Sequence, residues 1–337
     1  MRTVLPTEEE LNGMSELLQG KVAIVTGSGQ GIGRDVALCL AEHGAKVITN
    51  NRKPGSSLDA FEKTEIPFTD EERAALESVK GDAKTTADRI VAGGGEAVPF
   101  FGDVGDFATA GRMVQTAIDS FGRIDIIVNN ASSNWVGNIA DMDEDLWDIS
   151  VVSKLKGAFN LIHHALPHMK AQGYGRILNS SSDAFLGLQG YAAYGAANAG
   201  IVALTKAAAG DLRGTGITVN AYTPLAKTRA WYNAAATYRM QGVPAEMIEA
   251  GAPEAMKRTA EGMVPFLAYL ASDDAAAISG NLFKLAADGE IGLWSQPEVV
   301  RQITTDADAW AIDVLRERVP GELMAGLSND EGILPIR

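Results

Sequence analysis

From Lys21 onward, short runs rich in β-branched residues alternate with longer segments whose apolar residues recur every three to four positions. This alternation predicts a parallel sheet covered by helices on both faces, because each strand must be followed by a crossover helix. The predicted strands are 22–27, 46–50, 97–103, 124–131, 175–181, 217–224 and 281–289. The predicted helices are 31–43, 106–121, 145–171, 192–213 and 254–272. The sequence therefore predicts a single doubly wound α/β domain around a seven-stranded parallel sheet.

Three segments fall outside this repeat. Residues 1–19 form an acidic N-terminal extension, and residues 53–84 are a polar insertion after the second strand that folds as a flap or partly as a helix. Residues 295–337 form a C-terminal tail with one amphipathic helix, TDADAWAIDVLRERV. We therefore expect the domain to cover residues 20–294, with an extension at each end.

The charge of the chain limits its partners. A formal net charge of −14 disfavours nucleic acid and an anionic membrane surface. The sequence has no apolar run approaching the ~20 residues that span a bilayer, and its first residues lack the apolar centre of a signal peptide. Cys39 is the single cysteine, so the chain cannot form a disulfide with itself. We expect a cytoplasmic protein that acts on a small molecule.

A glycine-rich segment, TGSGQGIG at 26–33, lies between the first predicted strand and the first predicted helix. Gly27 permits a tight turn, Gly31 lets the backbone approach a pyrophosphate, and Gly33 lets helix and strand pack closely. The N–H groups and the dipole of the helix start then bind phosphates. A turn alone would explain a glycine run equally well, but the place of this one in a βαβ unit predicts a Rossmann-type dinucleotide site.

The second strand ends in Asn50-Asn51-Arg52-Lys53, about twenty residues after the glycines. An NAD site usually has an acidic residue here, which accepts hydrogen bonds from the ribose 2′-hydroxyl. Arg52 can instead pair with a 2′-phosphate. The pattern favours NADP over NAD. The alternative is that Arg52 is a solvated loop charge.

Several motifs resemble those of the short-chain dehydrogenase/reductase family over roughly residues 20–290. TGSGQGIG is similar to TGxxxGxG, Asn129-Asn130-Ala131 to the start of NNAG, and Tyr194 to Gly200 to YxxxKAG. The insertion, the segment PLAKTR and the ending SGNLFKLAADGEIGLW resemble the (3R)-hydroxyacyl-CoA dehydrogenase domain of multifunctional enzyme type 2 and its bacterial relatives. The loop and the resemblance together assign cofactor binding to Gly27, Ser28, Gln30, Gly31, Ile32, Gly33, Asn51, Arg52, Asp103, Val104, Asn130, Ala131, Pro224 and Thr228.

The resemblance implies hydride transfer with a tyrosine as general acid/base, a serine that polarises the carbonyl, and a lysine that lowers the tyrosine pKa. Tyr194 matches the tyrosine. Ser182 matches the serine by its distance from the strand, and Ser181 is the alternative, because the spacing from Ser182 to Tyr194 is one residue shorter than usual.

The family lysine is missing, because position 198 is asparagine. The family also places an asparagine in the helix after the fourth strand, where this chain has Lys154. Our hypothesis is that the two residues are exchanged, so that Lys154 supplies the ammonium and Asn198 holds ribose or water. The alternative is that both changes followed a loss of catalysis.

The sequence thus predicts an NADP-dependent oxidoreductase that interconverts a secondary alcohol and a ketone, with a hydroxyacyl thioester or a bulky or aromatic carbonyl as candidate substrates. The alternative is a catalytically silent, nucleotide-binding subunit that supports an active partner. The resemblance implies a homo-oligomer, dimer or tetramer, paired through the helices at 145–171 and 192–213. His164 and His168 lie four residues apart, but no third ligand is evident, so no metal site is expected.

Overall fold

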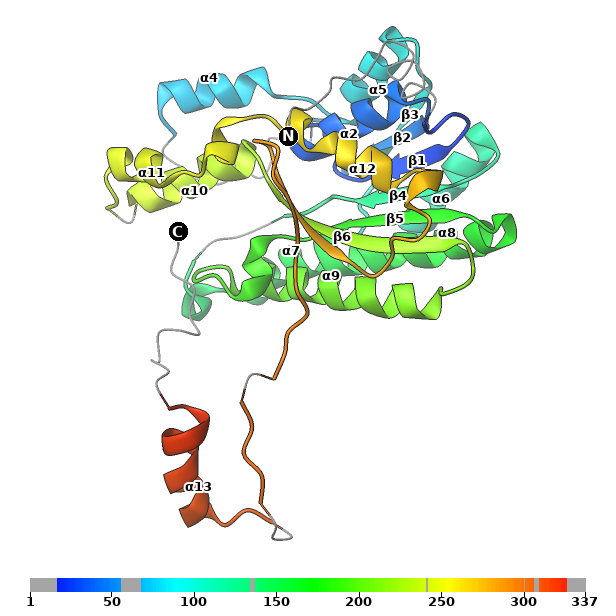
Figure 1. Cartoon of the computed structure of the whole chain (residues 1–337). Helices are drawn as coiled ribbons and strands as arrows, with labels where there is room; N and C mark the ends of the chain where they lie inside the picture. The colour runs from blue at the N-terminus through cyan, green and yellow to red at the C-terminus, as the bar shows by residue number, and fades with distance from the viewer. Residues whose placement is uncertain are drawn as a thin grey trace, which may run out of the picture.

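Eight strands form one sheet in the order β3-β2-β1-β4-β5-β6-β7-β8 (Figure 1). The structure is a computed structural model that describes residues 17–55, 68–133, 137–240, 242–299, 301–305 and 309–325. The strands are β1 (Val22–Val25), β2 (Lys46–Asn51), β3 (Ala97–Phe101), β4 (Ile126–Asn129), β5 (Gly175–Ser180), β6 (Ile217–Leu225), β7 (Leu282–Ala286) and β8 (Ile291–Leu293). The first seven pair in parallel, as the sequence predicts.

The eighth strand corrects the predicted count of seven. β8 pairs antiparallel with β7, with Phe283 opposite Leu293. β8 has only three residues, which are too few to show a period of two in the sequence. The chain order reverses between β1 and β4, so the loops after these strands diverge and leave a crevice at their carboxyl ends.

Helices cover both faces of the sheet (Figure 1). The α-helices are α2 (Gly31–Glu42), α4 (Asp70–Ser78), α5 (Ala83–Ala92), α6 (Phe107–Phe121), α7 (Glu144–Ser150), α8 (Gly157–Gln172), α9 (Ala192–Asp211), α10 (Arg229–Met240), α11 (Ala245–Gly251), α12 (Val264–Leu270) and α13 (Ile312–Arg318). One buried apolar cluster joins α2 and α12 to the sheet, and a second joins α6 and α8 to its other face. The result is the three-layer arrangement expected of a doubly wound domain.

The predicted helix at 254–272 is wrong in its length. The segment contains two short 3₁₀ turns, η4 (Glu254–Lys257) and η5 (Ala260–Gly262), followed by α12. Pro265 lies in the first turn of α12, because a proline deeper in a helix would remove a hydrogen bond and clash with the preceding turn. Arg258 has an extended backbone, which separates the two 3₁₀ turns.

The predicted helix at 145–171 is present, with one irregularity. Between α7 and α8 the chain forms a π-helical segment, η2 (Val151–Lys156), and the three elements run on without a break. A π-helical turn contains an extra residue and is common at functional sites. Lys154 lies inside η2.

The insertion after β2 is partly helical, as one of its two predicted forms requires. It contains α4, which begins with a capping box between Thr69 and Glu72, and it leads into α5, which is capped by Asp82. The helix α5 packs against β2 and β3. Residues 56–67 lie outside the described part of the chain.

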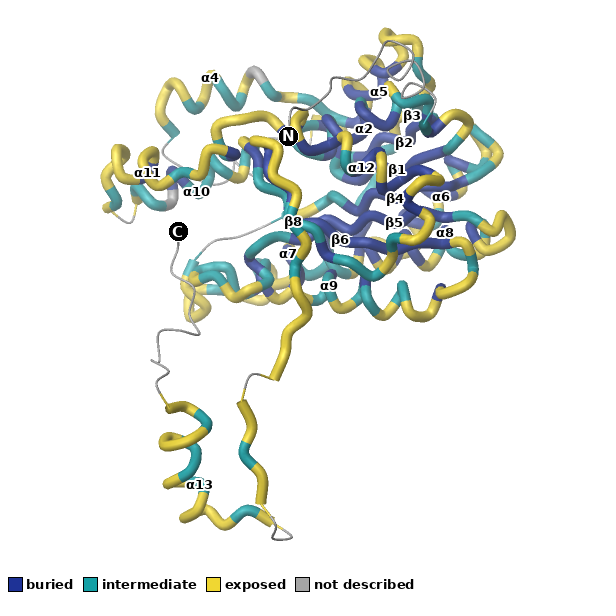
Figure 2. The backbone as a smooth tube through the Cα atoms, in the orientation of Figure 1, coloured by how far each residue is buried: buried dark blue, intermediate teal, exposed yellow. Residues whose placement is uncertain are grey.

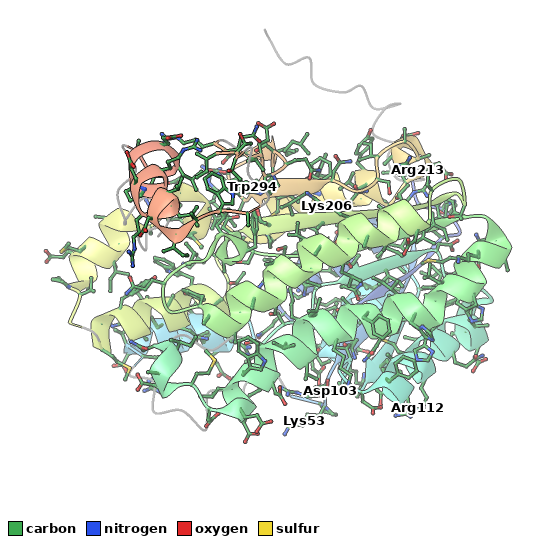
Figure 3. All side chains as sticks on the ribbon, turned by 90° about the horizontal axis from the view of Figure 1, so that it is seen from below. Lys53, Asp103, Arg112, Lys206, Arg213 and Trp294 are labelled. Carbon is green, nitrogen blue, oxygen red and sulfur yellow. The ribbon has the colours of Figure 1, made fainter. Side chains whose placement is uncertain are left out.

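The two chain ends differ in how they meet the body. Leu18 is fully buried, whereas residues 1–16 lie outside the described part. After β8 the tail runs away from the sheet, and most of its residues are exposed (Figure 2). Near its start the indole N–H of Trp294 donates to Thr223 and Lys206 donates to Gln296 (Figure 3). The tail helix α13 is shorter than the predicted amphipathic helix.

A buried carboxylate joins the start of β1 to the start of β4. Asp125 is fully buried and accepts a hydrogen bond from the backbone N–H of Val22 at 2.9 Å. Its carboxylate also accepts hydrogen bonds from Arg123 Nε at 2.7 Å and Arg123 Nη2 at 2.6 Å. We expect Asp125→Ala to lower the free energy of unfolding by about 3 kcal/mol, because it leaves a buried donor and a charge without their partner. The urea midpoint measures this loss. Asp119→Ala, on the exposed side of α6, is the control and should change it by less than ~0.5 kcal/mol.

Candidate active site

The phosphate loop connects β1 to α2 at the crevice. Gly31 has a φ of 55°, and a Cβ on Gly33 would lie 2.4 Å from both the Asn130 Nδ2 and the Gly27 carbonyl oxygen, so both positions require glycine. No side chain caps α2, and its first turn contains no acidic residue. The N–H groups of that turn therefore remain available to an anion.

The segment Asn129-Asn130-Ala131 fixes the crevice between β1 and β4. The Asn130 side chain donates to the carbonyl oxygens of Thr26 at 3.1 Å and Gly27 at 3.3 Å. The backbone N–H groups of Asn130 and Ala131 both donate to the Thr26 hydroxyl at 2.9 Å. These bonds hold the loop after β4 against the phosphate loop.

A cavity of about 510 Å³ lies in this crevice, within the size range of small-molecule sites. The sequence-predicted cofactor residues that line it are Gly27, Gln30, Gly31, Ile32, Asn51, Arg52, Asp103, Val104, Asn130, Ala131 and Thr228. Lys53 and Asp103, from the loops after the neighbouring strands β2 and β3, lie at one edge of the molecule (Figure 3). Asn51 lines the cavity, and its buried Oδ1 has no hydrogen-bond partner among the described residues.

Three other predicted cofactor residues lie outside the lining: Ser28, Gly33 and Pro224. The Ser28 hydroxyl is buried and accepts a hydrogen bond from the Asn50 backbone N–H at 2.8 Å. Pro224 lies within β6, opposite Leu285. In this structure Ser28 and Gly33 shape the phosphate loop.

The cavity contains more basic than acidic side chains, although the chain as a whole is acidic. Its basic residues are Arg34, Arg52, Lys227 and Arg229, and its acidic residues are Asp35 and Asp103. Burial and the nearby charge of Arg52 lower the pKa of Arg229 to about 10. Lys227 and Arg229 were not predicted as cofactor residues, although both belong to the segment PLAKTR, from which only Pro224 and Thr228 were assigned to the cofactor. The cavity suits a polyanion such as a dinucleotide.

Tyr194, the predicted acid/base, lies in the first turn of α9 and lines the cavity. Burial raises the pKa of its phenol, and hydrogen bonding to Ser182, Asn198 and Ser132 acts in the opposite direction. The Ser181 hydroxyl is buried and donates instead to the Asn198 carbonyl at 3.1 Å. The structure therefore brings Ser182, rather than Ser181, to Tyr194.

Lys154 is buried in η2, which packs against α9, the helix that carries Tyr194 and Asn198. Burial lowers the pKa of Lys154 to about 7. In the described part of the chain its ammonium donates no hydrogen bond, and it is not among the groups that shift the pKa of Tyr194. The Asn198 Nδ2 donates to the Tyr194 carbonyl at 2.7 Å, whereas the buried Asn198 Oδ1 has no partner there. The buried side chain of Lys154 and the buried Asn198 Oδ1, which has no partner among the described residues, thus lie on two neighbouring elements.

The histidines of α8 and the apolar helices were the remaining sequence features to be located in the structure. His164 Nε2 lies 2.9 Å from the carbonyl oxygen of Phe107. Among the described residues, no three His, Cys, Asp or Glu side chains form a group that could hold a metal ion. No helix in the same part of the chain is long and apolar enough to cross a membrane.

Comparisons with known proteins agree with this geometry. Residues 69–289 match the family described as Enoyl-(Acyl carrier protein) reductase. The chain is 36% identical over 215 residues to the (2S)-[(R)-hydroxy(phenyl)methyl]succinyl-CoA dehydrogenase subunit BbsD of Thauera aromatica, covering 64% of this chain and 76% of that protein.

The hydroxyacyl-CoA dehydrogenase ChsB1 of Mycobacterium tuberculosis is 34% identical over 302 residues, which are 87% of this chain and 85% of that protein. It is a bacterial protein of the type that the motifs indicated. A crystal structure of a short chain dehydrogenase from Mycobacterium avium superimposes with a TM-score of 0.72 at 31% identity, covering 91% of this chain and 96% of that one. The chain therefore belongs to the short-chain dehydrogenase/reductase family of oxidoreductases.

Proposed function

We propose that this chain is an NADP-dependent dehydrogenase that interconverts a secondary alcohol and a ketone. The observation that carries the proposal is the cavity, which joins an uncapped helix start, a glycine loop and Tyr194. The residues fit a dinucleotide, because the cavity is basic and a Cβ at Gly33 would fill the loop. The α2 N-terminus would hold the pyrophosphate, and Arg52 with Arg229 would hold a 2′-phosphate.

The chemistry divides between cofactor and protein. A bound nicotinamide cofactor would supply hydride transfer to the ketone carbon, or from the alcohol in the reverse direction. In ketone reduction, Tyr194 donates its phenolic proton to the carbonyl oxygen, and the Ser182 hydroxyl donates a hydrogen bond to the same oxygen. The proposed role of Lys154, which lies in η2 beside α9, is that its ammonium would stabilise the phenolate left on Tyr194. Asn198 is available to hold a water or the ribose beside it.

The proposed substrate is a hydroxyacyl or ketoacyl thioester, with a bulky or aromatic acyl group as the second choice. Two relatives support this class by name: ChsB1 is a hydroxyacyl-CoA dehydrogenase, and BbsD is a subunit of an enzyme whose CoA thioester contains a phenyl group. The experiment is NADPH and NADH oxidation by the purified chain with 3-ketoacyl thioesters and aryl ketones. Turnover with a thioester supports the proposal. Tight cofactor binding without turnover of any substrate contradicts it.

A second candidate is a catalytically silent subunit that binds a nucleotide and supports an active partner. The asparagine at position 198 favours it, because an amide cannot lower the pKa of a phenol by charge. The name of BbsD, a dehydrogenase subunit, is consistent with it. This candidate predicts that turnover requires a second protein, whereas the first predicts turnover by the chain alone.

We also propose that the chain pairs with itself through α8 and α9. On α8, Phe159 is 45% exposed and stacks on Phe107, which is 41% exposed, with ring centroids 6.4 Å apart. Exposed aromatic side chains of this kind are common at interfaces. Light scattering should give a dimer or tetramer. Phe159→Glu, which places a charge on this face, should shift the mass toward the monomer.

The proposed role of Lys154 predicts a pH dependence. Because the pKa of Lys154 is lowered to about 7, its ammonium form is populated below that pH and is lost above it. Burial raises the pKa of Tyr194, so the phenol stays protonated over the same range. The kcat for ketone reduction should be level below pH ~7 and fall up to tenfold for each unit above it. A profile that stays level to pH 9 would contradict this role.

A further inference from the structure

The insertion after β2 is attached at its α5 end to the phosphate loop. The Thr86 hydroxyl of α5 donates to the carbonyl oxygen of Ser28 at 2.8 Å. The Thr49 hydroxyl of β2 donates to the carbonyl oxygen of Ala83 at 2.7 Å. A Cβ on Gly29 would lie 2.6 Å from the Asp82 Cα, so the loop and the insertion are in direct backbone contact. This end of the insertion is fixed to the pyrophosphate side of the cavity.

The α4 end of the insertion also borders the cavity. Ala75 of α4 and Val79, the residue after its end, line the cavity, as do Tyr232 and Arg229 of α10. The insertion therefore contributes apolar side chains to the cavity wall. The helix α10, which follows β6, contributes to the same wall. Figure 1 shows α4 beside α10, away from the sheet.

An ion pair joins α4 to α10. Arg239 of α10 donates to both carboxylate oxygens of Glu72 on α4, at 2.8 and 2.6 Å. The side chains are only 23% and 13% exposed. Such a pair is shielded from solvent, so removing one partner leaves a poorly solvated charge.

Glu72 is also held in place by a hydrogen bond at the start of its own helix, α4. Its carboxylate accepts a hydrogen bond from the Thr69 backbone N–H at 2.8 Å, which completes the capping box. Burial acts to raise the pKa of Glu72, but the hydrogen bonds from Arg239 and Thr69 outweigh it and hold the pKa below its ordinary value. The carboxylate is therefore ionised at neutral pH, and the same side chain both starts α4 and joins it to α10.

We propose that Glu72 and Arg239 are positioning residues that hold α4 against α10 as the outer wall of the cofactor cavity. With the wall in place, Ala75 and Val79 cover a bound dinucleotide. The dinucleotide leaves when α4 separates from α10, so the ion pair sets its rate of release. The proposal rests on the dinucleotide site proposed above and assigns a role to the insertion.

The test is the dissociation rate of NADPH, measured by stopped-flow fluorescence with excess NADP⁺ as competitor. Glu72→Gln retains the capping box but loses the charge, and Arg239→Gln removes the other partner. Each single variant should release NADPH about tenfold faster, and the double variant should be no faster than the singles, because the pair acts as one unit. Glu71→Gln, the exposed neighbour on α4, is the matched control and should leave the rate unchanged.

A second readout separates positioning from general loss of structure. The hydride step, isolated with 4-deuterated NADPH, should keep its rate in the Glu72 and Arg239 variants while release accelerates. If NADPH leaves both single variants at the wild-type rate, or if the double variant is additive, the proposed wall is wrong. If the wild-type chain binds no dinucleotide at all, the proposed function fails instead.

Discussion

Lys154→Met is expected to lower kcat at least ~100-fold and, at the same time, to make the protein more stable. The loss of activity follows from the proposed mechanism, in which the ammonium of the buried Lys154 stabilises the Tyr194 phenolate. General acid–base assistance contributes factors of this size. The gain in stability follows from burial. Methionine fills similar space without a charge that must be removed from water.

The pKa of Lys154 is about 7 in the folded protein and 10.5 ordinarily, so between these values the unfolded chain binds more protons. The penalty is therefore fully present below pH ~7 and disappears as pH rises toward 10.5. We expect Lys154→Met to gain about 3 kcal/mol, or ~5 °C in Tm, at pH 6, and little at pH 10.

Scanning calorimetry at the two pH values, run beside steady-state kinetics, measures both effects. Lys156→Met is the matched control, because Lys156 lies in the same π-helical segment with an exposed side chain. It should change neither activity nor Tm by much. A Lys154→Met protein that is less stable and equally active would show that Lys154 is a structural residue.

Arg52→Gln is expected to raise the Kd for NADPH about 30-fold and to change the Kd for NADH less than threefold. A guanidinium paired with a phosphate contributes about 2 kcal/mol, and only NADPH carries the 2′-phosphate. Arg52 and Arg229 line the same cavity, and the charge of Arg52 contributes to the lowered pKa of Arg229. A phosphate bound to both side chains would relieve this repulsion of like charges.

Fluorescence titration with the two reduced cofactors checks this prediction, and Lys53→Gln on the same exposed loop is the control. Weaker binding of both cofactors would place Arg52 on a part that they share, such as the pyrophosphate. Unchanged binding of both would make Arg52 a solvated loop charge and would remove the argument for NADP.

The parallel sheet could be predicted from the sequence because the strands are buried on both faces. In β1 and β4 every residue is buried, so each strand is a short apolar run that stands out between helices of a different period. The antiparallel β8 could not be predicted in this way. Its two outer residues are exposed, and it is held in place by pairing with β7 rather than by its own pattern.

In the candidate site too, the parts with a local sequence motif could be predicted, and the parts that depend on tertiary contacts could not. The phosphate loop and Tyr194 belong to local motifs, and the structure places Gly27, Gly31 and Tyr194 around one cavity. The contributions of Arg229 and of α4 depend on tertiary contacts between segments far apart in the chain. No local pattern encodes such contacts. The π-helical geometry around Lys154 was likewise hidden, because the segment VVSKLK fits an ordinary helix equally well.

The exchange of lysine and asparagine is tested most directly by reversing it. Lys154→Asn, Asn198→Lys and the double variant, which restores the family arrangement, would be compared with wild type for NADPH oxidation with a 3-ketoacyl thioester. We predict that Lys154→Asn loses at least ~100-fold in kcat and that the double variant recovers to within about tenfold of wild type. Wild-type turnover in Lys154→Asn, or a folded double variant as inactive as Lys154→Asn, would contradict the proposal that Lys154 replaces the missing lysine.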